Sequence, residues 1–311
     1  MTSPAIDIAM VGLVLGVGLW SLLARDAVPA VIGFIVYGML VSLAWVRLGA
    51  IDVAMTEAAI GGGATGILIM RAALRKGAPA PSESRSPLVP VLAVALCAGV
   101  AVVLALLVLE PVVPAPSLAP LALANLPSTD LRNGVTAVLM AYRGIDTLLE
   151  KVVLAVGLIA VWSLTPDALW GAQAGQPRAA EPDSVLGLLA RVLPPIGILV
   201  GIYLVWAGAN EPGGAFAGGT IVAAMWVLVI LSGLKDPPAM ASRALRVCLV
   251  AGAGLFIGVG LAGLFFGSSF LAYPDGFAKP LIILIEAAMT LSIAATIGLL
   301  VLGPPDREPA P

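Results

Sequence analysis

Three glutamates, Glu57, Glu150 and Glu286, lie inside or at the edge of segments that are otherwise apolar enough to cross a bilayer. A charged carboxylate at the centre of a membrane helix costs about 2.5–3.5 kcal/mol on insertion scales, so such acids usually face a bundle interior, water or a basic partner. The chain has no histidine, which leaves carboxylates, lysines and water to carry any proton. These residues therefore point towards ion translocation.

The first acidic motif contains Asp52 and Glu57, followed by the triple glycine Gly61–Gly63. We expect Asp52 to cap the helix that begins here, by accepting hydrogen bonds from N–H groups of the first turn. Glu57 lies one to two turns deeper and is either a side chain that extends to the membrane surface or bonds to a neighbouring helix, or a proton relay. The glycines would allow a second backbone, or water, to come close to it.

The second motif runs from Tyr142 to Lys151. Arg143, Asp146 and Glu150 follow i, i+3, i+7 spacing, which predicts that they lie along one helix face. Lys151 lies about 100° further round the helix and would either meet an acid of another helix or extend to the membrane surface. A structural ladder of ion pairs would have the same spacing as a relay.

Two further segments carry polar groups into the last third of the chain. Residues 210–219 form a Pro-Gly turn that leads into a glycine-rich helix, which is typical of a tight outside turn, or alternatively of a water-filled vestibule or partner contact. In the final apolar run, Lys279 is expected to extend to the outer interface. Glu286, two turns deeper, needs a partner or a proton.

Composition defines the elements that must position these residues. With 60% hydrophobic residues, 11% charged residues and a mean hydropathy of +1.08, the chain has the composition of a polytopic membrane protein. Runs of about 20 apolar residues suffice to cross a bilayer. They predict nine helical spans, near residues 4–24, 28–47, 51–74, 88–109, 134–164, 185–208, 214–234, 244–268 and 279–303.

The basic residues predict the orientation of these spans. If the N-terminus is outside, the inside loops and tail hold 11 of the 16 Lys and Arg residues. The positive-inside rule therefore favours an N-out, C-in all-α bundle. Polar, Pro-rich connectors at 76–87 and 165–183 divide the chain into three pieces, 1–75, 88–164 and 184–303.

Several function classes find no support in the sequence. A net charge of −2 does not favour nucleic-acid binding. No spacing of His, Cys and Asp indicates a metal site, and no nucleophile elbow or nucleotide loop is present. We therefore expect neither enzymatic chemistry nor a cofactor.

At three motifs the chain resembles Mrp-type multisubunit cation/proton antiporters and the related membrane-bound hydrogenases. Residues 1–75, with IDVAMTEA at 51–58, look like the three-helix MbhD-like module. Residues 88–164, with RGIDTLLE at 143–150, are similar to the MbhE-like two-helix module. Residues 184–303 resemble the four-helix antiporter module MnhB/MrpB, through NEPGGAFAGG at 210–219 and KPLIILIE at 279–286.

The resemblance implies a subunit of a complex that exchanges Na⁺, or another monovalent cation, for H⁺ across the bacterial cytoplasmic (inner) membrane. Its partners would be a large antiporter-like A subunit and small multi-helix subunits. Glu57 and Glu150 would be the main relay groups on one path, with Glu286 standing apart from them. The residues in supporting or charge-tuning roles would be Asp52, Asp146, Arg143 and Lys151.

The chain also departs from the family. The first two modules commonly end the large A subunit, whereas here they are joined to the MnhB-like module. Position 286 is Glu where Asp is frequent, and Lys151 stands where a neutral residue is expected. Two rival functions remain open: an ion-translocating subunit of a hydrogenase-like or respiratory complex, and a passive scaffold.

Overall fold

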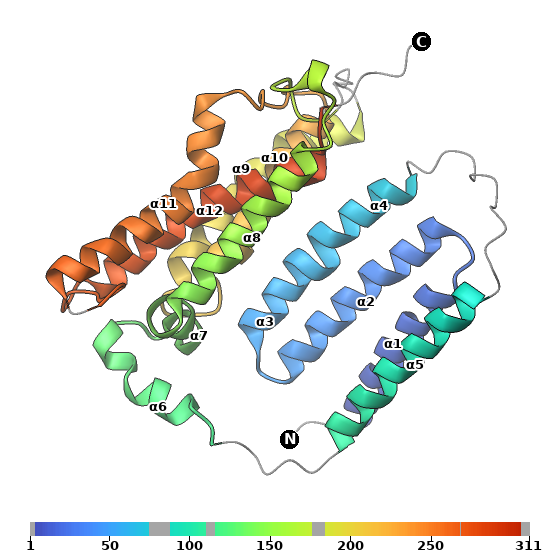
Figure 1. Ribbon diagram of the computed structural model, residues 1–311, viewed down its shortest axis with the longest axis horizontal. Coiled ribbons are helices and arrows are strands. Elements are labelled where there is room, and N and C mark those ends of the chain that lie inside the picture. The colour runs from blue at the N-terminus through green and yellow to red at the C-terminus, as the bar shows by residue number, and fades with distance from the viewer. Residues whose placement is uncertain (1–3, 75–87, 110–115, 176–183, 268, 306–311) are drawn as a thin grey trace.

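The computed structural model describes residues 4–74, 88–109, 116–175, 184–267 and 269–305 (Figure 1). Within these ranges the chain consists of helices and connections, with one isolated antiparallel bridge between Gln173 and Ala239. The prediction of an all-α, multi-pass membrane protein is confirmed.

The helices follow the apolar runs of the sequence. Their bounds are α1 (Pro4–Leu23), α2 (Ala27–Arg47), α3 (Ile51–Thr56), the π-helix η1 (Glu57–Thr65), α4 (Gly66–Leu74), α5 (Leu88–Leu109), α6 (Ala119–Ala124), the 3₁₀ turn η2 (Leu126–Thr129), α7 (Gly134–Ala137), the π-helix η3 (Val138–Tyr142), α8 (Gly144–Trp162), the 3₁₀ turn η4 (Asp167–Leu169), α9 (Val185–Ala207), α10 (Ala215–Leu231), α11 (Arg243–Phe266) and α12 (Ala278–Leu302).

Each of the nine predicted spans coincides with helical residues. Among the described residues, six helices are long and apolar enough to cross a membrane: α1, α2, the continuous Ile51–Leu74 segment, α9, α11 and α12. Val91–Leu107 and Ala215–Leu231 are shorter apolar helices. The number of nine spans and the N-out, C-in orientation stay predictions.

The fifth predicted span, 134–164, is not one continuous helix. It consists of α7, η3 and α8, with a break at Arg143, whose φ of −130° and ψ of 36° are not helical. A π-helix has one more residue per hydrogen-bonded ring than an α-helix and often occurs at functional sites. Here both π-helices lie beside ionisable residues, since η1 begins at Glu57 and η3 ends just before Arg143.

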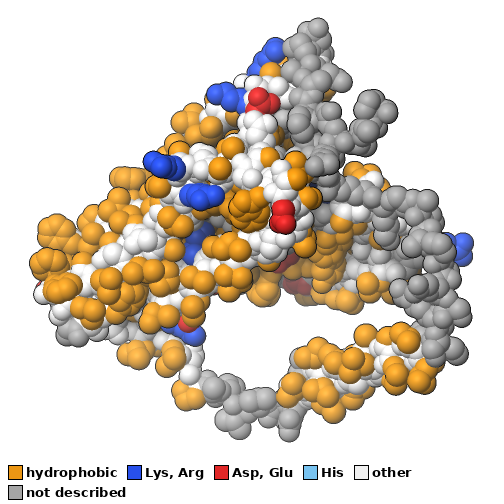
Figure 2. Space-filling model, turned by 45° about the horizontal axis from the view of Figure 1, so that its top comes forward, with side chains coloured by type: hydrophobic (Ala, Val, Ile, Leu, Met, Phe, Trp, Pro, Cys, Tyr) orange, Lys and Arg blue, Asp and Glu red, His pale blue; other side chains and the backbone are white. Residues whose placement is uncertain are grey.

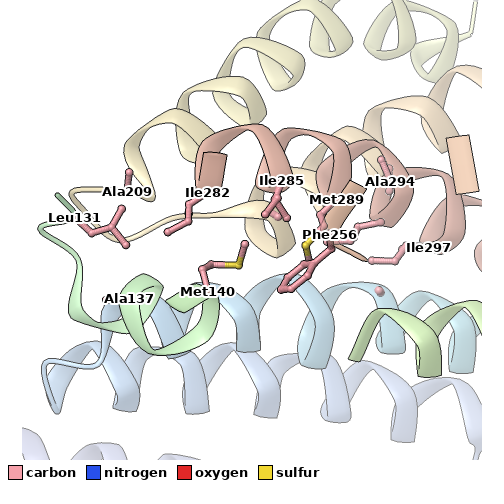
Figure 3. Packing of buried hydrophobic residues seen from close by; sticks show 14 of the residues in the cluster. Leu131, Ala137, Met140, Ala209, Phe256, Ile282, Ile285, Met289, Ala294 and Ile297 are labelled. Atoms are coloured by element: carbon pink, nitrogen blue, oxygen red, sulfur yellow. The ribbon is translucent and has the colours of Figure 1, made fainter. Parts of the chain in front are cut away.

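The core surrounds α12, which Figure 1 shows among α8, α9, α10 and α11. Two-thirds of its apolar window is buried, compared with about a fifth of the windows of α9 and α11. Figure 3 shows Ile282, Ile285 and Met289 of α12 facing Ala137 and Met140 of the α7–η3 segment. The central helix is therefore covered by residues from all three predicted pieces, since α4 of the first piece also packs against it.

Small residues bring several helices into backbone contact. A Cβ at Gly218 of α10 would lie 2.6 Å from the carbonyl oxygen of Gly201 in α9, and one at Gly38 of α2 would lie 2.8 Å from the Gly62 Cα of η1. Such close approach is typical of helix pairs in lipid, where packing and not water exclusion drives association.

Helix α5 stands away from α8, although both belong to the second predicted piece (Figures 1 and 2). Its described side chains are all exposed. Figure 2 also shows that hydrophobic side chains cover most of the visible surface. An apolar exterior of this kind is expected for helices that face lipid.

Candidate functional site

A cavity of about 280 Å³ lies where the three predicted pieces of the chain meet. Three carboxylic acids line it, Asp52 from α3, Glu150 from α8 and Glu286 from α12. The other lining residues are Val53, Thr56, Val135, Thr136, Leu139, Met140, Thr147, Gly213, Gly214, Ala215, Phe216 and Met289.

Asp52 does not cap its own helix, contrary to the sequence prediction. Ala50 is the N-cap residue of α3 and makes no capping side-chain hydrogen bond. Instead, the Asp52 Oδ1 atom accepts hydrogen bonds from Asn133 Nδ2 at 3.2 Å and from the Gly213 backbone N–H at 3.1 Å. The carboxylate thus joins α3 to both of the other pieces, because these external donors satisfy it in place of the first helical turn.

Asn133 was not singled out from the sequence. Its Oδ1 caps α7 by accepting from Val135 N at 2.9 Å, and its Nδ2 also donates to the Glu211 carbonyl at 3.0 Å. The backbone N–H of Asn133 donates to Ala209 O at 3.3 Å. The position of Asn133 before an apolar helix would have predicted the cap. Its contacts with residues 209–211 could not be predicted, because they join segments far apart in the sequence.

Glu286 lies at the inner wall of the cavity and is 5% exposed. Its carboxylate accepts a hydrogen bond from the Ala215 backbone N–H, while Oε2 is buried and has no hydrogen-bond partner in the described part of the chain. Gly214 has a φ of +96°, and a Cβ there would lie 3.1 Å from Glu286 Oε1. The prediction that Glu286 stands apart is therefore wrong in geometric terms, since it shares the cavity with Asp52 and Glu150.

Tyr273, in the connection between α11 and α12, lies near this glutamate. Burial, with a smaller contribution from the Glu286 carboxylate, raises the pKa of Tyr273 above its ordinary value. The neutral phenol donates a hydrogen bond to the Met140 carbonyl at 2.9 Å. It thereby fastens the α11–α12 connection to η3, behind the acidic cavity.

The predicted stripe of Arg143, Asp146 and Glu150 is only partly correct. Arg143 lies outside α8, at the helix break, and its Nε is 2.6 Å from Asp146 Oδ2. This ion pair is accessible, with side chains 71% and 49% exposed. Glu150, one turn further along α8, reaches the cavity, whereas neither Arg143 nor Asp146 is among its lining residues.

Lys151 neither extends to the membrane surface nor pairs with an acid of another helix among the described residues. It is 4% exposed, and its Nζ atom is buried without a hydrogen-bond partner there. The ammonium lies 5.3 Å from the centroid of the Phe216 ring, which itself lines the cavity. A cation over an aromatic face is attracted by the ring quadrupole, most strongly where both groups are desolvated.

Glu57 lies outside this cavity. Its carboxylate lies along η1, close enough to Gly61 that a Cβ there would collide with it, and a Cβ on Gly38 would be 3.6 Å from its Oε1. The side chain is half-buried on the α2 side of η1. The glycines thus do bring a second backbone close, as expected, but the structure does not place Glu57 and Glu150 in one cavity.

The turn at residues 208–214 packs against α7. Thr136 Oγ1 donates to the Gly208 carbonyl at 2.6 Å, and Lys279 Nζ donates to Asn210 Oδ1 at 2.8 Å. Lys279 is thus held by Asn210, so the turn is tied to α12 and forms one wall of the cavity. The extension of Lys279 to the outer interface stays a prediction.

The chain matches two protein families. Residues 12–77 match MbhD, a family of subunits of MBH. Residues 185–304 match a family described as a domain related to the MnhB subunit of Na⁺/H⁺ antiporter. The acids of α3 and α12 thus belong to two different family domains.

Two relatives are similar over part of the chain. An uncharacterised protein of Methanocaldococcus jannaschii, MJ1307, is 29% identical over 154 residues, which cover 45% of this chain and 59% of that protein. A putative antiporter subunit, mnhB2, of Staphylococcus saprophyticus is 29% identical over 100 residues, which cover 32% of this chain and 71% of that protein.

Two solved structures share the fold. A chain of the Mrp complex from Dietzia sp. DQ12-45-1b matches all of this chain with a TM-score of 0.76 and 28% identity, and this chain spans 36% of its length. A chain of the membrane-bound sulfane sulfur reductase, an archaeal respiratory membrane complex, matches 70% of this chain with a TM-score of 0.55. At 24% identity, the second match shows the fold alone.

Proposed function

We propose that this chain, which carries an MbhD domain and a domain related to the MnhB subunit of Na⁺/H⁺ antiporters, is a membrane subunit of an Mrp-type antiporter complex. The complex would exchange Na⁺, or another monovalent cation, for H⁺. The full-length match to a chain of the Dietzia Mrp complex supports this function. The observation that carries it is the cavity in which Asp52, Glu150 and Glu286 meet.

Such a cavity suits cation/proton exchange for an electrostatic reason. A carboxylate in a poorly solvated site gains stability from either a proton or a metal cation, and each competes with the other for the same negative charge. Glu286, with one oxygen free of hydrogen bonds to the described residues, and Glu150 would be the exchanging groups. Asp52, held by two donors, would contribute a fixed negative charge.

The remaining acidic and basic residues would have supporting roles. The Arg143–Asp146 pair at the start of α8 would limit the net charge near the cavity entrance. Lys151 would oppose cation binding from its place on Phe216. Glu57, at the η1–α2 contact, would serve a separate step or a contact with another subunit. Residues 88–164, with RGIDTLLE, would be the MbhE-like module.

The chain would act with partners and without catalytic chemistry of its own. We infer a large antiporter-like A subunit and small multi-helix subunits in the same complex, in the bacterial cytoplasmic (inner) membrane. Residues equivalent to 64% of the matched Dietzia chain lie outside the match, which is consistent with further transport machinery beside these modules. A redox-coupled complex is the less favoured alternative. The membrane-bound sulfane sulfur reductase matches only 70% of this chain, and at 24% identity that match supports a common fold alone.

The test is antiport by everted membrane vesicles that contain the complete complex. Addition of Na⁺ to respiring vesicles should collapse the pH gradient, which a pH-sensitive fluorophore reports. Glu286→Gln and Glu150→Gln should each lower this response at least tenfold. Gln keeps the shape of Glu, but its amide neither takes up and releases a proton nor carries a negative charge that binds a cation. Immunoblots of the purified complex would verify that it remains assembled.

Glu211→Gln is the matched control. Glu211 is an exposed acid of the same turn whose side chain does not line the cavity, so the variant should retain parental antiport. Normal antiport in both Glu286→Gln and Glu150→Gln would instead favour a passive scaffold.

A further inference from the structure

A second cavity, of about 420 Å³, lies between α8 and α11 and reaches Thr296 of α12. It is at the opposite end of α8 from the acidic cavity, since Glu150 borders one cavity and Trp162 the other. Its walls are mainly aliphatic: Ala155, Leu158, Ile159, Leu249 and Val250.

Two paired connections close the end of this cavity. Met240 N donates to Ala172 O at 2.9 Å and Ala241 N to Gly171 O at 3.3 Å, so the connection after α8 is joined to the one before α11. Arg246, on the first turn of α11, donates from Nε to Met240 O at 3.1 Å. The guanidinium is thereby fixed at the closed end, among the residues that line the cavity.

One residue that lines the cavity, Trp162, carries a polar donor without a partner among the described residues. The indole Nε1 of Trp162 is buried and has no hydrogen-bond partner in the described part of the chain. An unpaired buried N–H costs about 1–3 kcal/mol. An acceptor on a molecule bound in the cavity would remove that cost.

The helices beside the opening present apolar side chains outwards. Val153 and Val156 of α8 are 70% and 56% exposed, and Val247 of α11 is 64% exposed. In a multi-pass membrane protein such a surface faces hydrocarbon. Two residues that line the cavity, Ile159 of α8 and Val250 of α11, are themselves 62% and 63% exposed on this lipid-facing side.

We propose that this cavity binds one phospholipid with an anionic headgroup. An acyl chain lies along the aliphatic walls, and a headgroup or ester oxygen accepts from Trp162 Nε1 and pairs with Arg246. Trp and Arg at helix ends are typical of membrane interfaces, and basic pockets between helices bind anionic lipids there.

A membrane helix of another subunit is a weaker fit to the same features. Its apolar side chains would fill the aliphatic part of the cavity, but they would leave the Trp162 donor without an acceptor and the Arg246 charge without an anion. A phospholipid supplies hydrocarbon and acceptor oxygens together.

Fluorescence quenching by brominated lipids tests this inference. The intact complex is reconstituted in vesicles of phosphatidylcholine and phosphatidylglycerol in equal amounts, with bromine on the acyl chains of one lipid or the other. The contribution of Trp162 is the difference between the parent and Trp162→Phe. Brominated phosphatidylglycerol should quench it about fivefold more effectively than brominated phosphatidylcholine, the preference expected from one basic residue near the membrane surface.

Arg246→Gln should abolish the preference and Arg246→Lys should largely restore it. Arg191→Gln is the matched control, because Arg191 is an exposed basic residue of α9 outside the cavity, and it should leave the preference unchanged. Equal quenching by the two lipids in the parent would overturn the proposal, because the cavity would then not select an anionic headgroup. Absence of quenching by either lipid would overturn it too, since a partner helix would then fill the cavity.

Discussion

At the scale of residues, the acidic cavity combines two carboxylates that differ in how fully their oxygens are hydrogen-bonded. Asp52 accepts two hydrogen bonds from other parts of the chain, whereas Glu286 keeps one buried oxygen without a partner among the described residues. Buried polar atoms are usually satisfied, and exceptions often have a functional reason. The free oxygen of Glu286 is therefore the atom at which we expect an incoming ion or proton to bind.

Lys151 provides a prediction about cation affinity. Lys151→Met removes an ammonium group beside the acidic cavity, so the Na⁺ concentration for half-maximal antiport should fall about tenfold, the order expected for unit charges at an effective dielectric constant near 20. The measurement is a Na⁺ titration of the fluorescence response in everted vesicles. Lys151→Arg keeps the charge and should stay near the parental value.

Lys235→Met serves as the control for Lys151→Met. Lys235 is exposed in the connection between α10 and α11, and its loss should not change the half-maximal concentration. An unchanged or higher value in Lys151→Met would show that the ammonium does not oppose the cation.

Asp52 provides a prediction about stability. Asp52→Ala leaves the Gly213 N–H and one Asn133 bond without their acceptor, and hydrogen bonds to charged groups contribute about 1.5–3 kcal/mol each. We expect the unfolding free energy to fall by about 3 kcal/mol, and by less in Asp52→Asn, which keeps an Oδ1 acceptor. Thermal unfolding of the purified complex in detergent would measure this.

Asp236→Ala is the control for Asp52→Ala. It removes an exposed acid from the connection between α10 and α11, so it should leave the midpoint of thermal unfolding unchanged. If Asp52→Ala unfolds at the same temperature as this control, Asp52 does not hold the junction together.

The candidate acidic residues were predictable from the sequence, but the residues that they contact were not. Acids within apolar runs are recognisable one by one, and the sequence alone therefore indicates Asp52, Glu150 and Glu286 as candidate site residues. The bond from Gly213 to Asp52 joins residues 161 positions apart, and neither hydropathy nor helical spacing reports contacts at such separations. For the same reason, the burial of Lys151 against Phe216 was not foreseen.

At the scale of elements, Gly214 at the start of α10 gives a backbone test. Its φ of +96° and ψ of −176° lie in a region used almost only by glycine, and an added Cβ would lie 3.1 Å from Glu286 Oε1. Gly214→Ala should therefore lower the unfolding free energy by about 1–3 kcal/mol. Thermal unfolding again provides the measurement.

Gly254→Ala is the matched control in α11. A Cβ there meets nothing within 4 Å, so the variant should be neutral or more stable by roughly 0.5–1 kcal/mol, the helical advantage of Ala over Gly. Equal effects of the two substitutions would mean that the Gly214 conformation carries no strain for alanine.

Helix placement was predictable where the chain is uniformly apolar. The predicted spans 51–74 and 88–109 coincide with Ile51–Leu74 and Leu88–Leu109. The break at Arg143 and the π-helices were not predicted. Hydropathy measures whether a segment tolerates lipid, and it carries no information on the number of residues per turn.

At the scale of the whole molecule, the three predicted pieces are joined by a small number of polar contacts among the described residues. Residues 132–136 bond to the turn at 208–211, and Asp52 bonds to both segments. The second piece is itself divided, since α8 packs on α11 and α12 while α5 lies elsewhere. Composition predicts the three pieces, but an exposed apolar helix such as α5 carries no polar signal that fixes its position.

The separation of Asp52 from Gly213 also has a consequence for biosynthesis. At about 5–20 residues per second, roughly 8–32 s pass between the emergence of these two residues from a ribosome. Asn133 emerges about halfway through this interval, 81 residues after Asp52, so the Asp52 carboxylate first lacks both of its eventual donors and then lacks the Gly213 N–H. We expect the nascent chain to engage an insertase or a waiting partner at this stage, so that codon choice between residues 75 and 213 influences the yield of the mature protein.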